Sequence, residues 1–502
     1  MNQLKRNIVA NFLGRAWTNI LAILFIPVYL RFIGVEGYGI IGFFTLLQSV
    51  IGFMDLGIGA ALNREMARLS FTEGSAEEQR DLLRTLEVIY WFLAIFAGTL
   101  VFIMAPFLAH DWIKTENMPA DSVLSAIRLM GFAIILQFPM ALYQAGLMGL
   151  QKQVLVNGVL VAVGTLRTFG SVLVLWLLSS TVQAFLGWQL LVNALSSGIF
   201  LYYLWRNLPV SSGRPHFKTS LMKGIWKYAA AMGGNAFLGV ALTQLDKIIL
   251  SKMLSLEVFG YYVLAGTVAA GIWSIIGPFN AALFPRFVQL YEIRNFDGLS
   301  RLLHSSSQVL SVILLPITVI LIFFAHDILL IWTRNSVVAE NAHMLTSLLV
   351  LGAAINGLAS VPATASTAFG WPQLITFTNL AQALVLVPAT VIMTKYYGAL
   401  GAATVSVFLN CTYLLIMTPI FFRRCLGAEK WLWYVRDTGT PLLCTLMVCL
   451  SSYYLMPQSI TSTTTLLWLF ATWLIASIHA SFFCSNIRNN ILRYIRNGLV
   501  LR

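Results

Sequence analysis

The sequence predicts an all-α polytopic membrane protein of about fourteen transmembrane helices, with two pseudo-symmetric six-helix lobes followed by two C-terminal helices. Three observations predict this fold. The 502 residues are 58% hydrophobic and only 10% charged, whereas soluble domains carry about 25% charged residues. Apolar runs of about twenty residues recur along the whole chain. A short segment near the start recurs 221 residues later.

The apolar runs are each long enough to cross a bilayer, whose hydrocarbon core needs about twenty helical residues. We place them at residues 11–31, 38–63, 86–109, 122–148, 154–178, 184–205, 225–250, 259–285, 304–325, 343–369, 373–394, 398–421, 440–457 and 464–484. The first run follows Lys5 and Arg6, but no small-residue cleavage site follows it. We therefore expect it to remain as a membrane span.

Basic residues are concentrated in alternate loops. With the N-terminus in the cytoplasm, fourteen spans return the C-terminus to the cytoplasm, and the cytoplasmic segments hold 23 of the 32 Lys and Arg residues. The opposite loops hold five. Cytoplasmic loops are enriched in Lys and Arg, so this distribution supports the span count and predicts cytoplasmic termini. It also accounts for most of the net charge of +13, so no nucleic-acid partner is expected.

The repeated segment is RFIGVEGYG (31–39), which aligns without gaps on KMLSLEVFG (252–260). Six spans separate the second span from the eighth, so the two copies point the same way through the membrane, as in transporters built from parallel repeats. We therefore expect an N-terminal lobe at 1–205, a cytoplasmic linker at 206–224, a second lobe at 225–421, a cytoplasmic loop at 422–439, and two C-terminal helices with a basic tail at 440–502. The cleft between the lobes is the expected substrate route.

Six charged residues are candidates for charges deep in the membrane: Arg15, Asp55, Arg128, Arg167, Asp246 and Lys247. A charge at bilayer depth costs about 2.5–3.5 kcal/mol and usually faces a cavity. The four cations, Arg15, Arg128, Arg167 and Lys247, predict a cationic cavity that binds an anionic substrate group, because the arginine fork binds phosphate through two parallel hydrogen bonds. The two carboxylates, Asp55 and Asp246, are candidates for ion coupling or for pairing with these cations.

Other interpretations of these charges stay open. A salt bridge of Asp55 with Arg15 or Arg167 would be structural, and so would an anchor formed by the adjacent Asp246 and Lys247 near a helix end. The five cysteines form no CxxC pair, so we expect no metal site, disulfide or cofactor. Residues 70–87 mix acids and bases and predict a solvated amphipathic helix. No loop is long enough for a catalytic domain, so we do not expect an enzyme.

Several motifs, in their order along the chain, resemble those of polysaccharide flippases of the multidrug/oligosaccharidyl-lipid/polysaccharide exporter superfamily. They are NIVANFLGR (7–15), YLRFIGVEGYG (29–39), DLGIG (55–59), NREMAR (63–68), LDKIIL (245–250) and GYYVL (260–264). The resemblance spans most of the first twelve helices and includes the count of fourteen.

The resemblance implies a bacterial inner-membrane flippase for an undecaprenyl-pyrophosphate-linked oligosaccharide. Such a protein turns its substrate from the cytoplasmic to the periplasmic leaflet by alternating access, in the biosynthesis of O-antigen (lipopolysaccharide) or a related surface polysaccharide. The implied partners are the lipid-linked glycan, membrane lipids, a coupling proton or sodium ion, and the polysaccharide polymerase and chain-length proteins. The predicted cationic cavity agrees in kind, because pyrophosphate and sugars cannot cross hydrocarbon unaided.

Three alternatives remain open. A lipid II flippase of the same superfamily would carry a different lipid-linked glycan. A drug or cation exporter of the same superfamily would favour a more acidic cavity. A membrane polysaccharide polymerase or glycosyltransferase would usually need a sizeable outside loop or an acidic metal-binding cluster, and neither is visible in the sequence.

Overall fold

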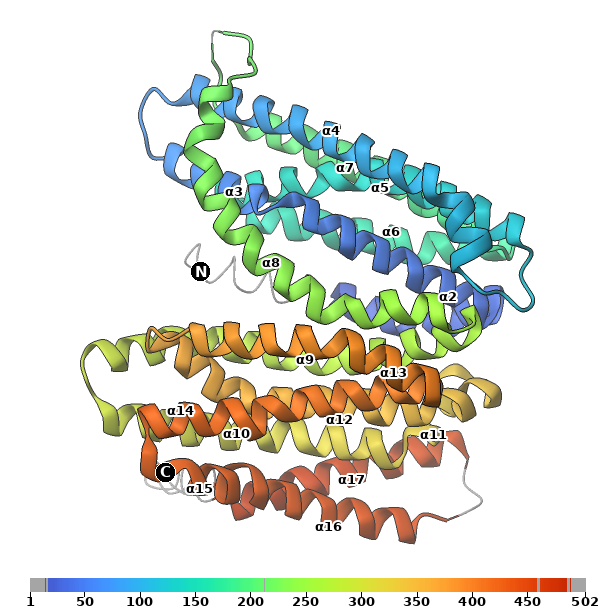
Figure 1. The fold of residues 1–502 in the computed structure, drawn as a ribbon, viewed down its shortest axis with the longest axis vertical. Helices are drawn as coiled ribbons and strands as arrows, with labels where there is room; N and C mark the ends of the chain where they lie inside the picture. Colours follow the sequence, from blue (N-terminus) through green and yellow to red (C-terminus); the bar gives the residue numbers. More distant parts are fainter. Residues whose placement is uncertain (1–13, 15–16, 212, 458–460, 485–487, 489–502) are drawn as a thin grey trace, which may run out of the picture. The chain divides into compact units, whose positions relative to one another are not determined.

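The structure, a computed structural model, describes residues 14, 17–211, 213–457, 461–484 and 488 (Figure 1). Within this part of the chain the regular structure is helical, apart from an isolated bridge between Lys114 and Ser255. The predicted all-α fold is therefore confirmed. The chain divides into two compact units, Met1–Gly260 and Tyr261–Arg502.

The first unit contains a bundle in which α5 packs against both α4 and α7 (Figure 1). Its elements are α2 (Ile26–Gly52), the 3-10 turn η1 (Phe53–Asp55), α3 (Ile58–Leu69), α4 (Ala76–Phe107), the π-helical η2 (Leu108–Trp112), α5 (Ala120–Gly149), α6 (Gln153–Leu177), α7 (Val182–Asn207) and α8 (Thr219–Met253). The first turn of α9 (Leu256–Glu292) also belongs to this unit, and the rest of α9 belongs to the second.

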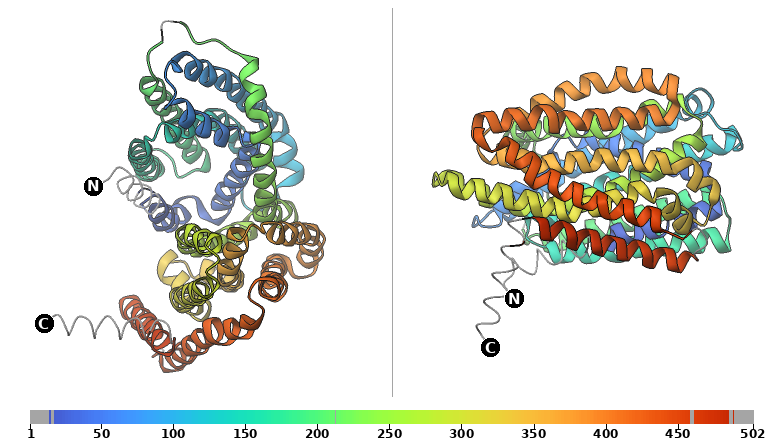
Figure 2. Two further views of the ribbon diagram at one scale, coloured as in Figure 1. Left: turned by 90° about the vertical axis from the view of Figure 1, so that its left-hand side faces the viewer. Right: turned by 90° about the horizontal axis from the view of Figure 1, so that it is seen from below.

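The second unit is a bundle in which α10 is the most extensively buried crossing. After α9 come α10 (Phe296–Phe323), α11 (Ala325–Thr333), α12 (Ser336–Ala368), α13 (Gln373–Thr412), η3 (Tyr413–Met417), α14 (Thr418–Cys425), η4 (Gly427–Glu429), α15 (Lys430–Leu432), the π-helical η5 (Trp433–Gly439), α16 (Thr440–Leu455) and α17 (Ser462–Phe483). α10 packs against α12, α16 and α17, and the last two form a pair, seen in red in Figure 2.

Eleven helices in the described residues are long and apolar enough to cross a membrane. Two of the helical elements contain two helices each: α2 is kinked at Gly34 and α13 at Gly398, where φ is +70° and +59°. At 40 residues, α13 would be about 60 Å long, twice the bilayer core, so it accounts for parts of two crossings. Counting α2 and α13 as two crossings each, and adding the 35-residue α8 to the eleven helices, gives about fourteen crossings. This number agrees with the prediction.

The two repeated segments meet inside the first unit. A Cβ atom on Gly39 of α2 would lie 2.4 Å from the carbonyl oxygen of Leu256, and a Cβ on Gly260 would lie 2.6 Å from the carbonyl oxygen of Val35. The repeat aligns Val35 with Leu256 and Gly39 with Gly260. The two close contacts are therefore equivalent: in each, the glycine of one segment meets the carbonyl of the other segment four residues before the aligned glycine. Glycine at both positions allows α2 and the first turn of α9 to approach at backbone distance.

Candidate functional site

Asp55 lies where a membrane-spanning helix is interrupted. The sequence predicts one continuous span over 38–63, but α2 ends at Gly52 and α3 begins at Ile58. Between them Leu56 and Gly57 adopt left-handed conformations, with φ of +48° and +78°. Broken helices of this kind form substrate and ion sites in many transporters because their free ends carry partial charges.

The Asp55 carboxylate sits at the positive end of α3. Its Oδ1 accepts a hydrogen bond of 3.0 Å from the backbone N–H of Gly59, in the first turn of that helix. A carboxylate in this position satisfies a free N–H and interacts favourably with the helix dipole, by about 0.3–1 kcal/mol at an exposed site and up to about 2 when partly buried. The hydrogen bond from Gly59 therefore offsets part of the cost of burying this carboxylate.

A cavity of about 150 Å³ with a largely apolar lining adjoins Asp55. Gln48, Gln137 and Gln144 line it together with Asp55, and the Nε2 of Gln144 is buried without a hydrogen-bond partner among the described residues. The hydroxyl of Tyr90 lies near the same carboxylate, because a methyl group placed on Gly59 would be 3.1 Å from Asp55 Oδ1 and 3.4 Å from the Tyr90 oxygen.

Tyr90 is fully buried, and its hydroxyl also has no hydrogen-bond partner among the residues that the structure describes. A buried hydroxyl without a partner costs roughly 1–3 kcal/mol, so such groups usually meet a water or an ion. A carboxylate and an amide at a small cavity, with a hydroxyl near the carboxylate, can bind a water, a proton or a small cation.

Arg167 of α6 is held by neutral groups from α7. Its Nη1 donates to Oε1 of Gln189 and its Nη2 to Oδ1 of Asn193, each at 2.8 Å. No carboxylate forms an ion pair with it among the described residues. Its positive charge is consequently solvated by amide dipoles but not neutralised, so it remains able to attract an anion.

A chain of amides joins Arg167 to the Asp55 cavity. The Nδ2 of Asn193 donates to Oε1 of Gln137 at 3.3 Å, and the same oxygen accepts a hydrogen bond from Nε2 of Gln48. Gln137 and Gln48 line the cavity. Two of the charges predicted from the sequence therefore lie at the ends of one polar network, which we call the amide network. It replaces the direct Asp55–Arg167 salt bridge that was one structural interpretation.

The other predicted site residues lie apart from this network. Arg128 is on the exposed face of α5, where its guanidinium stacks 5.3 Å from the ring centroid of Phe102. The Nζ of Lys247 is 3.4 Å from Oε1 of Gln244 in its own helix, and the neighbouring Asp246 is half-buried. Arg15 lies outside the described residues.

A buried carboxylate in α4 was missed by the sequence analysis. Residues 70–87 were expected to form a solvated helix, yet α4 is continuous from Ala76 and Glu87 is only 5% exposed. Its oxygens accept hydrogen bonds of 2.9 Å from the Tyr143 hydroxyl and from Nη1 of Arg84, and Trp91 donates to the same hydroxyl at 3.2 Å. The pairing neutralises Glu87, which argues for a structural role.

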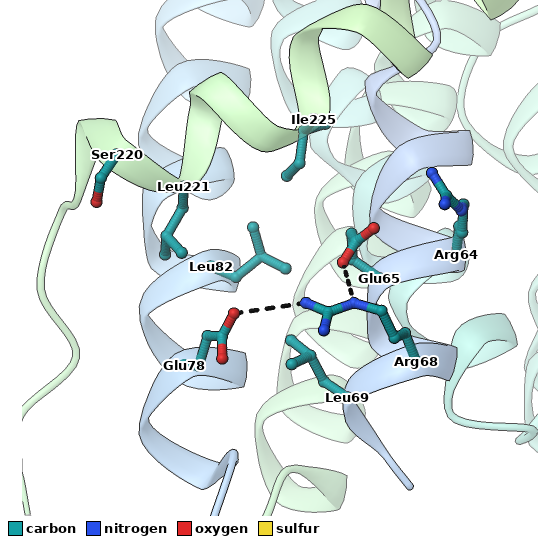
Figure 3. A pocket seen from close by; sticks show the side chains of 9 residues that line it. All are labelled: Arg64, Glu65, Arg68, Leu69, Glu78, Leu82, Ser220, Leu221 and Ile225. Carbon is teal, nitrogen blue, oxygen red and sulfur yellow. Dashed lines mark hydrogen bonds and ion pairs between the residues drawn. The ribbon is translucent and has the colours of Figure 1, made fainter. Parts of the chain in front are cut away.

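A second pocket, of about 370 Å³, lies at the end of α3, between α4 and α8 (Figure 3). Arg68 projects into it and is paired with Glu65 at 2.7 Å and with Glu78 at 3.5 Å. The hydrogen bond and charge of Glu65 raise the pKa of Arg68 above its usual value. Because two carboxylates already compensate this arginine, it is a weaker candidate for an anionic ligand than Arg167.

The residues before α8 are fastened to α4. The backbone N–H groups of His216 and Lys218 donate to Asp81 Oδ1 at 2.7 Å and to Thr85 Oγ1 at 2.9 Å. The Nζ of Lys218 pairs with Asp81 Oδ2 at 2.5 Å and with Glu77 at 3.2 Å. The hydrogen bond that Lys218 Nζ donates to Asp81 raises the pKa of Lys218. The expected linker is thus positioned by a buried carboxylate that the sequence pattern assigned to solvent.

The many apolar crossings, the broken helix and the charged network inside the bundle together define a polytopic membrane transporter. The family model described as "Polysaccharide biosynthesis protein" matches residues 4–291, more than half of the chain, and the chain belongs to this family.

Comparisons with individual proteins agree with this assignment. The chain is 22% identical over 423 residues to the "Putative O-antigen transporter" of Shigella flexneri, covering 84% of this chain and 98% of that protein. Its fold is similar to the lipid II flippase MurJ in an inward closed conformation, with a TM-score of 0.70, 13% identity, and coverage of 97% and 99%. An inward-facing multidrug resistance MATE family transporter of the MOP superfamily gives a TM-score of 0.67 at 16% identity, covering 82% and 96%. These relatives are transporters or flippases and not enzymes.

Proposed function

We propose that this protein flips an undecaprenyl-pyrophosphate-linked oligosaccharide from the cytoplasmic to the periplasmic leaflet of a bacterial inner membrane. It acts by alternating access of its two lobes and supplies O-antigen or a related surface polysaccharide. Membership of the polysaccharide biosynthesis family and the relationship to an O-antigen transporter support this substrate class. The protein then acts as a translocase without catalysis, with both termini in the cytoplasm and a polysaccharide polymerase and chain-length proteins downstream.

The observation that carries the proposal is the uncompensated charge of Arg167. Gln189 and Asn193 fix the guanidinium through two of its N–H groups and leave the others for a ligand. A pyrophosphate group carries negative charge and several acceptor oxygens, which suit the arginine fork. In the interior of a membrane protein, where water is scarce, such a pair is much stronger than at a surface.

Substitution of Arg167 tests this role in cells. Removing a hydrogen bond to a charged group costs about 1.5–3 kcal/mol, so Arg167→Ala is expected to reduce polysaccharide export at least about tenfold while the protein still inserts. Arg167→Lys keeps the charge but loses the fork and is expected to retain part of the activity. Arg206→Ala removes an exposed arginine from α7 and serves as the matched control.

The readout is surface polysaccharide per unit of membrane-inserted protein. Full export by Arg167→Ala at normal protein level would contradict the proposal. Rescue of a strain lacking its lipid II flippase, without rescue of surface polysaccharide, would assign the lipid II alternative instead.

The remaining predicted cations are kept as further contacts of the headgroup. Arg15, Arg128 and Lys247 add positive charge to the expected cationic surface, and Asp246 beside Lys247 is the second candidate for ion coupling or pairing. Arg128 is exposed, so it meets a headgroup only from outside the amide network.

We further propose that Asp55 binds the coupling ion, a proton or a sodium ion. The neighbouring cavity, the unpartnered Tyr90 hydroxyl and the free Nε2 of Gln144 support a site for a small ligand there. An ion bound at the break between α2 and α3 would change the charge at the end of α3, and so the balance between two conformations of the transporter.

Asparagine separates the structural role of Asp55 from its charge. Asn keeps a side-chain oxygen that can accept the hydrogen bond from Gly59, so Asp55→Asn is expected to preserve folding and to abolish the response of transport to an imposed ion gradient. Asp55→Ala removes this hydrogen bond as well and is expected to lower stability by about 1 kcal/mol. Transport by Asp55→Asn vesicles that still follows a proton or sodium gradient would exclude Asp55 as the coupling site.

A further inference from the structure

The second unit contains a buried ionisable cluster that the proposed transport mechanism does not use. His304 of α10 is 5% exposed and Asp437 of η5 is fully buried. The imidazole Nδ1 is hydrogen-bonded to Oδ2 of Asp437, and its Nε2 is 3.2 Å from Oε2 of Glu429 in η4. One ring therefore bridges two carboxylates that are eight residues apart in the segment between α14 and α16.

Two neutral donors complete the cluster from the same face of α10. Ser300, one turn before His304, donates to Oε1 of Glu429 at 2.7 Å. Gln308, one turn after it, donates to Oδ1 of Asp437 at 2.8 Å. Positions i, i+4 and i+8 lie on one side of a helix, so α10 presents a row of donors to this segment.

With both carboxylates ionised, the hydrogen-bond pattern requires a proton on each ring nitrogen of His304. An ionised carboxylate only accepts, whereas a neutral imidazole has one N–H donor and one acceptor nitrogen. A neutral His304 would thus place a lone pair against one of the two carboxylates. The imidazolium donates from both nitrogens, to Asp437 and to Glu429, and partly neutralises their charge. The carboxylates lie at opposite ring nitrogens and do not converge on one point, which does not suit a metal ion.

The elements packed around His304 supply few other ionisable groups that could take or give up the proton. The facing turns of α12, residues 359–368, carry no ionisable side chain. From α16 and the end of α17, Cys444 and Cys484 approach, and Cys484 interacts electrostatically with Asp437 and with Arg436 of η5. Cys484 is fully buried and packs with Val312 and Ala480, and burial among apolar groups keeps this thiol neutral, so it does not compete for the proton.

The cluster fixes the segment that leads into the C-terminal pair of helices. Trp433 of η5 is fully buried, packs with Leu303 and Phe422, and donates from Nε1 to Ser307 Oγ at 2.9 Å. These apolar contacts hold one side of the segment irrespective of pH. On the polar side, the ring donates to both Asp437 and Glu429 only while it is doubly protonated.

We propose that His304, Asp437 and Glu429 form a proton-binding site that fastens residues 427–439 to α10. With the proton bound, both carboxylates are tied to the helix. When the proton leaves, the neutral ring keeps one N–H and can donate to only one of the two carboxylates. Among the described residues the other carboxylate then keeps only its neutral donor on α10, Gln308 for Asp437 or Ser300 for Glu429, and the segment loosens on its polar side. The device makes the attachment of the C-terminal helices sensitive to pH.

Histidine NMR on the purified full-length protein in nanodiscs tests the site. The chain has six histidines, and His304→Gln identifies the resonance of His304. The expected result is a ring with both nitrogens protonated at about pH 7, which is above the range where an unperturbed histidine is mostly charged. The isosteric Asp437→Asn is expected to lower the pH at which the ring is half-protonated by about one unit or more, since an adjacent opposite charge shifts titration by about 1–3 units.

The control is His326→Gln, which removes an exposed histidine that also lies between two carboxylates, Asp327 and Glu340. It is expected to leave the His304 signal unchanged. Hydrogen exchange of residues 427–439, corrected for its intrinsic pH dependence, is expected to accelerate as the ring deprotonates. A neutral His304 at about pH 7, or an Asp437→Asn titration equal to that of the wild type, would overturn the proposal.

Discussion

Substitution of Gly39 by alanine is expected to destabilise the first unit. The added Cβ would lie 2.4 Å from the carbonyl oxygen of Leu256, whereas real Cβ atoms essentially never approach closer than 3.0 Å. Both partners are helical backbone, so α2 and the first turn of α9 must separate by about 0.6 Å or more, and neither side can relax by rotating a side chain. Overpacking of this kind typically costs about 1–3 kcal/mol.

Gly52, on the same helix, provides the matched control. A Cβ atom there meets no atom within 4 Å. Alanine is a better helix former than glycine by up to about 1 kcal/mol, so Gly52→Ala is expected to be neutral or slightly stabilising. The assay is unfolding of the purified protein in mixed micelles, followed by the fluorescence of its 14 tryptophans.

The repeat adds a second test of the same contact. Gly260→Ala places its Cβ 2.6 Å from the Val35 carbonyl and is expected to cost a similar amount. Because the separation of α2 from α9 that one alanine forces also makes room for the other, the double variant is expected to lose less than the sum of the two. If Gly39→Ala is as stable as Gly52→Ala, the inferred backbone contact between α2 and the first turn of α9 is contradicted.

Two further predictions concern buried carboxylates. Tyr143→Phe removes a donor to Glu87 and is expected to cost about 1–3 kcal/mol in the same unfolding assay, whereas Tyr202→Phe, at an exposed tyrosine, should cost little. Equal stability of the two variants would show that Glu87 does not depend on this bond. Asp81→Asn removes the charge that pairs with Lys218 and is expected to accelerate proteolytic cleavage within residues 208–218. An unchanged cleavage rate would show that Asp81 does not hold this segment.

The crossings were predictable because their signal is local. Each needs only a run of about twenty apolar residues, and the basic loops fix the count. The break at Asp55 also had a local signal, since two glycines follow it closely and the first of them, Gly57, is the N-cap of α3. The predicted span over 38–63 nevertheless treats this region as one continuous helix.

The amide network was not predictable from the sequence. Gln137, Gln189 and Asn193 are neutral, so they do not stand out in an apolar span as a charge does. Which face of a span points inward also depends on packing, and for this reason Arg128 and Arg167 were both assigned to the cationic cavity although Arg128 is exposed and Arg167 is hydrogen-bonded to α7. The cluster at His304 joins residues more than 120 positions apart, which no local pattern can reveal.

The central claim is that the protein carries a lipid-linked oligosaccharide across the membrane with the help of Arg167. The most direct measurement is the leaflet position of the loaded polyprenyl carrier in cells that express the wild type or Arg167→Ala at equal membrane levels. We expect the variant to leave the loaded carrier in the cytoplasmic leaflet, whereas the wild type delivers it to the periplasmic side. Equal delivery by both proteins would contradict the role of Arg167. If even a strain that lacks the protein delivers its carrier normally, the proposed flippase function is contradicted.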